Sequence, residues 1–443
     1  MKISGLLIRS TIVAALGGFL FGFDTAVISG TTGWLRETFE LSNFWLGFTV
    51  ASALIGTIIG AIAVGRPCDT YGRRKALFGL ALLYLVSAVG SAFAWSWYVL
   101  LFFRFIGGLG VGGASVVSPM YTAELSPAKY RGRLVAFVQF NIVLGILLAY
   151  LSNYVIGLLE LGQIEWRWMF GMEAFPAAIF FTLLMLNPHS PRWLVAKARV
   201  EEAKDVLSRC GTDTGNIDEE ISEIQKSLDL EHHSLKEPFF CKKYSTPIML
   251  AVMIAAFNQL SGINALIYYT KDIFQMAGYG SKSALFQSVL IGFTNLVFTM
   301  AAMAVIDHFG RKKLMLLGSI GYIVSLLGTA FAFFSGGGVL VLVGLLVFIA
   351  SHAFGQGAVI WVFISEVFPN RVRARGQALG SFTHWFMCAV ISLTFPLFAG
   401  IFGAYIFIIF ALCMVGQLIW VIFVMPETKG ISLEHMQKKL GIE

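Results

Sequence analysis

Three ionisable residues, Asp24, Arg104 and Glu173, stand inside apolar stretches of the sequence. A charge in the interior of a membrane costs about 2.5–3.5 kcal/mol or more, so each of them needs a reason. Each lies about two helical turns from the outer end of its stretch, which predicts a similar depth for all three, roughly 10 Å below the outer surface. Two acids and one base leave one surplus negative charge, and one proton is enough to neutralise it.

This charge balance predicts a proton-coupling group. We expect Asp24 to carry the proton, Arg104 to modulate the pKa of Asp24, and Glu173 to belong to the same network. The alternative is a fixed ion-pair cluster that ties three helices together. The second half of the sequence has no carboxylate within an apolar stretch, apart from residues at the stretch ends, and only His352 and His384 could titrate there.

Neutral amides form a second group of candidates. Asn258, Gln259 and Asn264 offer donors and acceptors of the kind that the hydroxyls of a sugar need. Gln259 and Asn264 are five positions apart, so we expect Gly262 to unwind the helix and let them converge. Tyr268 follows Asn264 by one helical turn, on the same face. For any single buried amide the alternative is an interhelical hydrogen bond.

Four further residues in apolar surroundings could complete such a site. Gln139 and Asn295 are additional amides, and Trp361 and Trp385 could supply flat apolar faces.

The composition indicates which elements hold these residues. The chain has 443 residues, of which 57% are apolar and 13% charged, and its mean hydropathy is +0.77. These values exclude a soluble globular enzyme, a disordered protein and a nucleic-acid-binding protein. Since a membrane-spanning helix needs about 20 apolar residues, the apolar stretches predict twelve spans. They lie near 9–30, 46–66, 76–96, 97–120, 134–157, 168–187, 246–270, 284–306, 314–334, 338–365, 376–400 and 403–425.

The distribution of Lys and Arg predicts the orientation. Thirteen of these residues fall in the short loops of one side and four in the loops of the other. By the positive-inside rule, both termini are cytoplasmic, and the net charge of +7 needs no nucleic-acid partner. The four residues counted as outer-loop charges are Arg36, Arg167, Lys271 and Lys282. The five cysteines form no C-x-x-C pair, so neither a metal site nor a cofactor is expected.

Two charged motifs recur along the chain. The segment 69–75 resembles 307–313 at an offset of 238, and Glu124 corresponds to Glu366 at an offset of 242. Parallel repeats of six helices explain two such nearly equal offsets, and in such folds the substrate site lies near the midplane between the halves.

The repeat divides the chain into three parts. We expect an N-terminal half over 1–187, cytoplasmic linker helices over 188–245, and a C-terminal half with a short tail over 246–443. In the linker, an amphipathic helix is predicted to begin at Pro191 and run to Cys210, followed by a second, acidic helix.

The repeated charges at the inner ends predict a gate. We expect salt bridges that lock the inner face and break when it opens; the alternative is a topology signal on a solvated surface. The gating candidates are Asp69, Arg73, Glu124 and Arg131 in the first half, and Asp307, Arg311, Glu366 and Arg373 in the second.

At these motifs the sequence resembles the sugar porter family of the major facilitator superfamily, and in particular its proton-coupled bacterial monosaccharide symporters. Eight segments in order carry the resemblance, over nearly the whole chain. They are FGFDTAVISG (21–30), GRPCDTYGRRK (65–75), RFIGGLGVGG (104–113), YTAELSPAKYRGRL (121–134), PHSPRWL (188–194), NQLSGINALIYY (258–269), SEVFPN (365–370) and PETKG (426–430). The departures are Thr70 and His308, where the family usually has Arg, and His189, where it usually has Glu.

The resemblance implies an all-α integral membrane protein of twelve helices in two six-helix halves. Matching motif positions imply a ligand shell of Gln139, Asn258, Gln259, Asn264, Asn295, Trp361 and Trp385, lined by Phe21 and Tyr268. Proton-coupled relatives carry Asp where Asp24 stands, whereas facilitative relatives commonly carry Asn. His384 replaces the usual Gln or Asn: it changes which hydroxyl is read, adds a pH dependence, or is a conservative polar exchange.

The expected function is proton-coupled symport of a monosaccharide, a hexose or xylose, by alternating access. The expected partners are the sugar, protons and the lipid bilayer of the plasma (inner) membrane, with a monomeric chain and no enzymatic activity. The alternatives are a facilitative sugar uniporter, a proton-coupled polyol or inositol carrier and, more remotely, a sugar sensor.

Overall fold

The computed structural model describes residues 4–211, 217–234, 238–369, 371–431 and 433–442. Within these ranges every regular element is a helix. The chain forms two compact units. Unit 1 comprises Met1–Thr25, Ile55–Ala149 and Arg167–Lys236, and unit 2 comprises Ala26–Leu54, Tyr150–Trp166 and Glu237–Glu443.

Three helices continue from one unit into the other: α1 (Gly5–Phe39), α2 (Asn43–Ala63) and α6 (Ala128–Leu158). The limits of the compact units therefore do not coincide with the limits expected from the repeat. The division into two six-helix halves and a linker stays a prediction.

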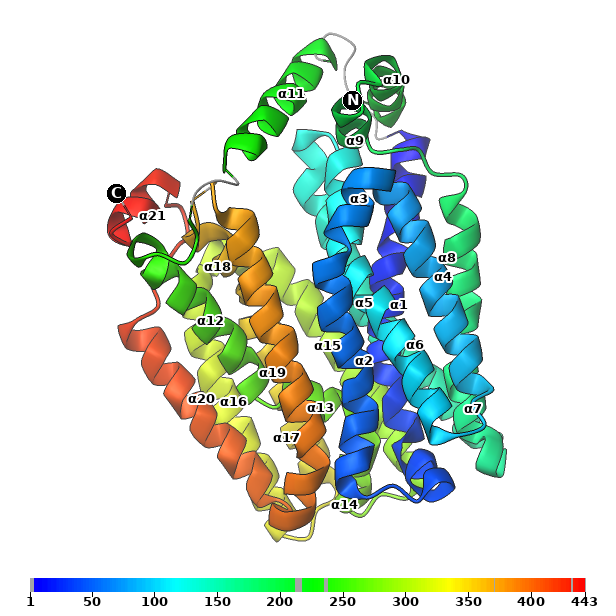
Figure 1. Ribbon diagram of the computed structural model, residues 1–443. Helices are drawn as coiled ribbons and strands as arrows, with labels where there is room; N and C mark the ends of the chain where they lie inside the picture. The colour runs from blue at the N-terminus through cyan, green and yellow to red at the C-terminus, as the bar shows by residue number, and fades with distance from the viewer. Residues whose placement is uncertain (1–3, 212–216, 235–237, 370, 432, 443) are drawn as a thin grey trace. The chain divides into compact units, whose positions relative to one another are not determined.

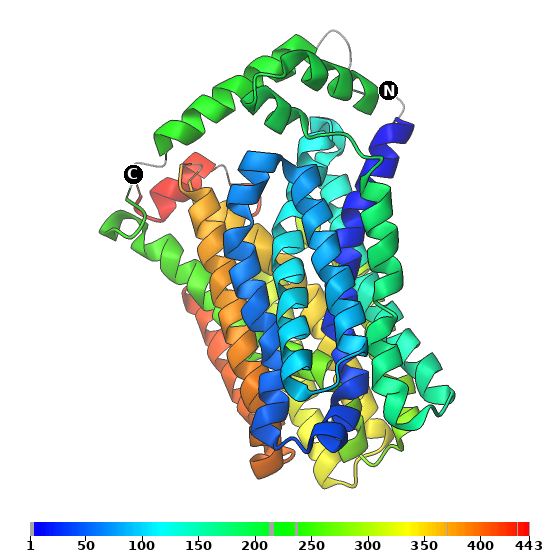
Figure 2. The same cartoon turned by 45° about the vertical axis from the view of Figure 1, so that its right-hand side comes forward.

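Unit 1 is built around long helices that are capped at one end by short ones (Figure 1). Besides parts of α1, α2 and α6, it holds α3 (Gly65–Tyr71), α4 (Arg73–Ala92), α5 (Trp97–Leu125), most of α7 (Glu165–Gly171), α8 (Ala174–Leu184), α9 (Pro191–Ala196), α10 (Val200–Cys210) and α11 (Ile217–Ser234). One core runs from Tyr84 and Tyr121 in the long helices to Trp193 and Leu207 in α9 and α10. Figure 2 shows α9 and α10 across the end of unit 1 at which α3 lies. The helices after the first six spans thus share the core of unit 1.

The single helix predicted from Pro191 to Cys210 is in fact two helices, α9 and α10. The chain turns between them, with Ala198 at a positive φ of 58° and the Arg199 N–H bonded to the Leu194 carbonyl. The turn lets the apolar sides of both helices reach the same core.

Unit 2 holds the remaining helices. They are α12 (Ser245–Leu260), α13 (Ile263–Tyr268), α14 (Thr270–Met276), α15 (Ser281–Phe309), α16 (Arg311–Phe334), α17 (Val339–His352), a π-helical turn (Ala353–Gly357), α18 (Ala358–Val367), α19 (Arg373–Phe402), α20 (Tyr405–Phe423) and α21 (Leu433–Lys439). Helix α12 packs against α18, α19 and α20, and α16 packs against α17 and α20 (Figure 1).

Eleven helices of the described residues are long and apolar enough to cross a membrane. The sixth predicted span, 168–187, is not among them, because it is divided into α7 and α8 with a break at Met172 and Glu173. The first span is longer than the predicted 9–30. It continues to Phe39, and the fully buried Thr31 donates to the Ile28 carbonyl of its own helix at 2.8 Å.

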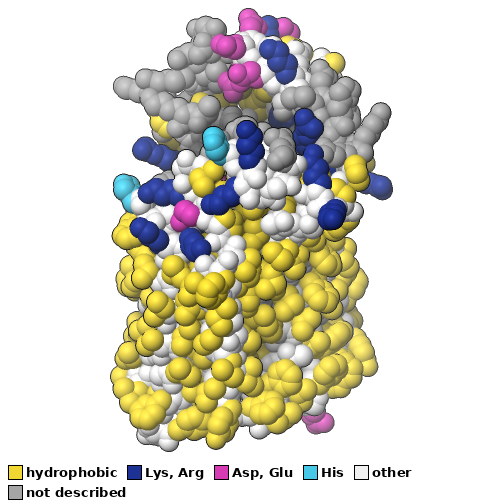
Figure 3. All heavy atoms as spheres, turned by 90° about the vertical axis from the view of Figure 1, so that its left-hand side faces the viewer, with side chains coloured by type: hydrophobic (Ala, Val, Ile, Leu, Met, Phe, Trp, Pro, Cys, Tyr) yellow, Lys and Arg dark blue, Asp and Glu magenta, His cyan; other side chains and the backbone are white. Residues whose placement is uncertain are grey.

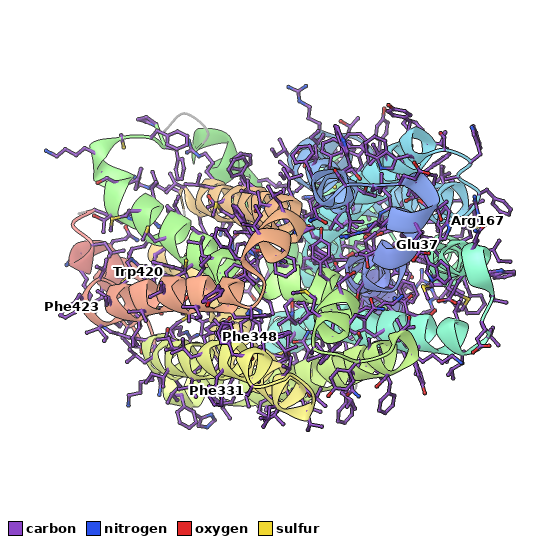
Figure 4. All side chains as sticks on the ribbon, turned by 90° about the horizontal axis from the view of Figure 1, so that it is seen from below. Glu37, Arg167, Phe331, Phe348, Trp420 and Phe423 are labelled. Atoms are coloured by element: carbon purple, nitrogen blue, oxygen red, sulfur yellow. The ribbon has the colours of Figure 1, made fainter. Side chains whose placement is uncertain are left out.

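The outward-facing side chains suit a lipid environment. The face drawn in Figure 3 is hydrophobic over most of its area, and Lys and Arg gather at one end. In unit 2, Phe331 and Phe423 lie on the outside and are 67% and 79% exposed, whereas Phe348 lies inside and is 1% exposed (Figure 4). Such large exposed apolar surfaces are expected where the solvent is hydrocarbon.

Candidate functional site

Unit 1 contains a buried ion pair between α1 and α5. The Arg104 guanidinium donates from Nη1 to Oδ1 of Asp24 at 2.5 Å and from Nη2 to Oδ2 at 3.5 Å. The side chains are 3% and 6% exposed. The guanidinium also lies over the Phe170 ring, 5.2 Å from its centroid. Breaking a buried ion pair leaves one charge without compensation, so removal of either partner alone is expected to be strongly destabilising.

Glu173 completes this group from the break between α7 and α8. It is 2% exposed, lies within hydrogen-bonding reach of Asp24, and is close enough to Arg104 to interact electrostatically. Tyr84, fully buried, lies beside both carboxyls, and its hydroxyl has no hydrogen-bond partner among the described residues.

The structure therefore brings together Asp24, Arg104 and Glu173. Helix α1 continues to Phe39, beyond the predicted end of the first span, and the depth of the three residues below the outer surface stays a prediction. What each residue does in coupling stays a prediction.

The amide group of unit 2 is organised by a break at Gly262. Helix α12 ends at Leu260 and α13 begins at Ile263, as expected from the glycine. Gly262 has a φ of +85°, and a Cβ there would come within 2.6 Å of the Phe410 ring. Both the backbone conformation and the lack of space require glycine.

The break lets three amides converge in a continuous hydrogen-bonded group. Gln259 Nε2 donates to Asn258 Oδ1 at 2.9 Å, and Asn264 Nδ2 donates to Gln259 Oε1 at 2.9 Å. Gln259 is fully buried and Asn258 is 2% exposed, whereas Asn264 is half-buried. Each amide is oriented by its neighbour, so the group presents a fixed set of donors and acceptors.

An aromatic group on α18 and α19 adjoins these amides. His384 Nδ1 lies 3.3 Å from Gln259 Nε2, and the imidazole lies between the rings of Trp361 and Trp385, with centroids 5.2 Å and 5.0 Å away. Trp361 is 40% exposed, whereas Trp385 is 5% exposed. Trp361 is thus the more exposed of the two indole rings beside His384.

Tyr268 joins this group through a residue that the sequence did not single out. The Tyr268 hydroxyl lies 3.8 Å from Cys388 Sγ, and the thiol also contacts Asn264. Cys388 follows His384 by one helical turn on α19, and this spacing could have indicated from the sequence that both side chains lie on the same face of the helix.

Three other predicted ligand residues lie on α15, α1 and α6. Asn295, on α15, is 7% exposed, and its Oδ1 accepts from Thr299 at 3.4 Å. Phe21 and Gln139 are half-buried residues of unit 1, on α1 and α6. Their roles stay predictions.

A charged cluster lies at the start of α4 in unit 1. Arg73 Nε donates to Oε1 of Glu124 at 3.1 Å and lies 3.0 Å from Oε2, and Ser190 Oγ donates to Glu124 as well. Asp69 Oδ1 lies 3.5 Å from Arg73 Nη1, but its side chain is 79% exposed. Glu124 and Arg73 are each 11% exposed, so their pair is the stronger contact.

The same arrangement recurs at the start of α16 in unit 2. Arg311 donates to both oxygens of Glu366, from Nε at 3.1 Å and from Nη2 at 2.9 Å. Thr428 Oγ1 donates to Glu366 Oε2 at 2.6 Å. Glu427 accepts four backbone N–H groups, those of Arg311, Lys312, Thr428 and Lys429, at 2.9–3.0 Å. Partial burial raises the pKa of Glu427, but these four donors outweigh it, so the pKa lies below its usual range.

The arginines that pair in these clusters are those at the helix starts, Arg73 and Arg311. Arg373 is not part of an ion pair: its Nε and Nη2 are buried and have no hydrogen-bond partner among the described residues. The side chains of Arg131 and Asp307 lie outside the part of the chain whose side chains the structure describes. Sequence spacing missed Ser190, Thr428 and Glu427, which come from segments distant in the chain.

One of the four outer-loop charges is placed differently from the expectation. Lys271 lies in α14 and is 3% exposed, and its Nζ donates to the Gly30 carbonyl at 3.2 Å. The neighbouring Asp272 accepts from Thr32 Oγ1 at 2.7 Å. A Lys-Asp pair directly after the aromatic end of an apolar stretch was the available signal. Because Lys271 was assigned to an outer loop, the packing of α14 on α1 was not predicted.

Among the described residues, no group of three or more His, Cys, Asp or Glu side chains could hold a metal ion.

Comparison with known proteins gives matches over nearly the whole chain. A family model described as sugar (and other) transporter matches residues 10–440. The arabinose-proton symporter of Bacillus subtilis (strain 168) is 36% identical over 441 residues, covering 98% of this chain and 95% of the relative. The D-xylose-proton symporter of Escherichia coli (strain K12) is 37% identical over 474 positions, covering 98% of this chain and 96% of the relative.

Solved structures agree with these relatives. The inward open conformation of the xylose transporter XylE from E. coli has a TM-score of 0.87 and 36% identity, over 98% of this chain and 99% of that chain. Its partially occluded inward open conformation has a TM-score of 0.86, over 97% of this chain and 100% of that chain. Since these matches are transporters rather than enzymes and cover almost every residue, the chain belongs to the sugar transporter family, within the sugar porters of the major facilitator superfamily.

Proposed function

We propose that the chain is a proton-coupled symporter of a monosaccharide, a hexose or xylose, and that it works by alternating access. The observation that carries this proposal is the buried group of Asp24, Arg104 and Glu173. The group contains two carboxyls and one guanidinium, whereas a purely structural ion pair needs only one carboxyl for one guanidinium. A proton bound to the additional carboxyl would change the charge of the group by one. Relatives whose names state proton symport of arabinose and of D-xylose support the proposal.

In this proposal Asp24 binds the proton. Arg104 competes with that proton for the carboxylate, and Glu173 shares it. When Asp24 is protonated, its bond to Arg104 weakens, which lowers the cost of moving α1 against α5.

The sugar would bind to the oriented amides Asn258, Gln259 and Asn264, with Trp361 against one face of the ring. A site already arranged to hydrogen-bond hydroxyls rejects ligands that lack them, because its buried polar groups are then unpaired. His384, Trp385 and Tyr268 would line this site. Phe21, Gln139 and Asn295 complete the proposed ligand shell.

We further place both termini in the cytoplasm, and the chain in the plasma membrane as a monomer. The excess of Lys and Arg in the loops on one side supports this orientation. The two charged clusters, at Glu124 and Glu366, would then stand at the inner face and act as its gate.

Facilitated diffusion is the second candidate, because the close Asp24–Arg104 pair would also suit a permanent structural contact. Purified protein in liposomes that enclose a pH-sensitive dye separates the two. Xylose, glucose, arabinose and inositol are added outside in turn, without any imposed gradient. Symport predicts that the transported sugar acidifies the lumen, whereas sugar entry without acidification would contradict it.

A further inference from the structure

The tenth predicted span is not one continuous α-helix. Helix α17 ends at His352, the π-helical turn occupies Ala353–Gly357, and α18 begins at Ala358. A π turn contains one residue more than an α turn, so it rotates everything that follows by about 100° around the helix axis. Such turns are rare, and they frequently occur at functional sites.

Helix α16 holds this turn at two places. Before the turn, the Tyr322 hydroxyl lies 2.5 Å from His352 Nδ1. Within the turn, Gly355 faces Gly318 so closely that a Cβ on either residue would come within 2.9 Å of the other's Cα. The backbones of α16 and the π turn are therefore in direct contact.

A chain of buried side chains fixes the turn from a third direction. Gln356, in the turn, donates from Nε2 to Oε1 of Gln417 on α20, and Gln417 donates from Nε2 to Ser319 Oγ on α16 at 2.8 Å. All three residues are fully buried.

The direction of these hydrogen bonds is determined. The Ser319 hydroxyl gives its proton to the Met315 carbonyl at 2.7 Å, so it accepts from Gln417. Because the Gln417 amide nitrogen donates to Ser319, its oxygen Oε1 is the atom that accepts from Gln356. In hydrocarbon an amide without partners is very unfavourable, so the chain favours the backbone conformation that keeps Gln356 within reach of Gln417.

We propose that Gln356, Gln417 and Ser319 are positioning residues for sugar binding. They hold the π turn and so set the rotation of α18, which carries Trp361 one helical turn beyond Gly357. In this rotation the Trp361 ring lies 5.2 Å from the His384 ring, next to Gln259. If the turn relaxed to an α turn, Trp361 would rotate by about 100° and leave the amides.

This inference rests on the proposed sugar site, since Trp361 matters only if a sugar stacks on it. The competing explanation is that the three side chains merely satisfy one another and stabilise the bundle. The two explanations differ in what happens when the whole amide pair is replaced by apolar side chains of similar size.

The test compares Gln417→Leu with the double variant Gln356→Leu/Gln417→Leu, in the full chain. The single variant leaves Gln356 without its partner and is expected to lower Tm. The double variant removes both partners, which is expected to restore most of the Tm. Sugar affinity, measured by calorimetry with the sugar that the liposome panel selects, is expected to fall about tenfold in the double variant.

Two further variants keep the result interpretable. Ser319→Ala removes the end of the chain with a small change in volume, and we expect sugar binding about threefold weaker. Ser325→Ala is the matched control, because Ser325 is a buried hydroxyl of α16 that bonds only to the Tyr322 carbonyl of its own helix among the described residues. It is expected to leave the affinity unchanged.

A double variant that regains the wild-type Tm and binds sugar within twofold of the wild type would overturn the positioning role. So would unchanged affinity in Ser319→Ala, if the double variant does not fold. Trp361→Ala separates this failure from that of the proposed function. If the wild type binds sugar and Trp361→Ala binds it much more weakly, the proposed sugar site is supported, whatever the results for the Gln356 and Gln417 variants. If the wild type binds none of the sugars, the proposed function itself is wrong.

Discussion

The two units hold different chemistry at the level of the membrane. The site candidates of unit 1 are a group of buried charges, Asp24, Arg104 and Glu173, whereas those of unit 2 are neutral amides around Gln259 and Asn264. An amide group can bind hydroxyls without changing its charge, and a carboxyl pair can bind a proton without recognising a sugar. Under the proposed function, this difference assigns proton binding and sugar recognition to separate residues, and coupling between them would then act through conformation.

At the charged clusters the two units are nearly alike, with one exception. Glu124 and Glu366 each bind an arginine and a hydroxyl, from Arg73 and Ser190 or from Arg311 and Thr428. In unit 2 this cluster also contains Glu427, which accepts the first N–H groups of α16.

In unit 1 the position 238 residues before Glu427, at the offset that relates segments 69–75 and 307–313, is occupied by His189. Its ring is stacked on Trp193, with centroids 5.0 Å apart, and its Nδ1 has no partner among the described residues. Burial, aided by the charge of Arg74, lowers the pKa of His189 below its usual range, so at neutral pH it brings no charge to the start of α4. The cluster of unit 2 is therefore the more extensively bonded of the two.

The largest effect is expected from the amides of unit 2. Gln259→Ala removes the side chain that links Asn258 to Asn264, and we expect sugar binding to weaken by about a hundredfold or more. Asn153→Ala is the matched control, since Asn153 is also a buried amide of unit 2 but bonds to the Val27 carbonyl. Calorimetry should show normal affinity for the control. Normal sugar affinity in Gln259→Ala would contradict the proposal that the sugar binds to these amides.

Next in size is the effect of the paired carboxylates on turnover. Glu366→Gln loses the bidentate bond to Arg311, and we expect exchange of labelled sugar to slow about tenfold while the Kd changes less than twofold. Glu124→Gln in unit 1 should slow exchange less, because Glu124 meets Arg73 through one nitrogen within hydrogen-bond distance. Equal effects of the two variants would break the comparison between the clusters, and normal turnover in both would exclude a gate.

A smaller effect concerns Glu427 and pH. Its folded-state pKa lies below the unfolded value of about 4.3. Its stabilising contribution is thus complete above that value and is lost as the pH falls through the folded pKa. In thermal melts Glu427→Gln should have a Tm about 2 °C below the wild type at pH 7, and the two curves should converge below about pH 4. A constant difference over this range would contradict the assignment.

The smallest effect is expected when a carboxylate is introduced at position 189 of unit 1, where unit 2 has Glu427. His189→Glu places an acceptor at the start of α4, and we expect a rise in Tm of about 1 °C or less at pH 7. His189→Gln, which has a similar size but no charge, serves as the control. A lower Tm for His189→Glu than for this control would show that α4 gains nothing from a carboxylate.

Local patterns in the sequence were enough for the family, the helical fold and the break at Gly262. They also selected Asp24, Arg104 and Glu173, since a charge in an apolar stretch stands out without any knowledge of its partners. The partners themselves depend on contacts between distant segments. Spacing along one motif could not show that Glu366 would bind Arg311 while Arg373 would not, or that Ser190 would reach Glu124.

Other features could not be predicted from the sequence, because the apolar content of a segment does not determine its backbone geometry. The sixth predicted span is as apolar as the others, yet it breaks at Glu173. The π turn around Gln356 depends on Gln417, which lies 61 positions further along the chain. Lys271 looked like a loop charge because its burial depends on residues of α1.

The central claim is that Asp24 couples sugar movement to protons. The most direct measurement is uptake of the labelled sugar into liposomes, with and without an inward proton gradient, for the wild type and Asp24→Asn. We predict that the gradient drives accumulation in the wild type, and that Asp24→Asn only exchanges sugar across the membrane, at a rate independent of the gradient. Equilibration without accumulation in both proteins would mean that Asp24 is structural and that the chain is a uniporter.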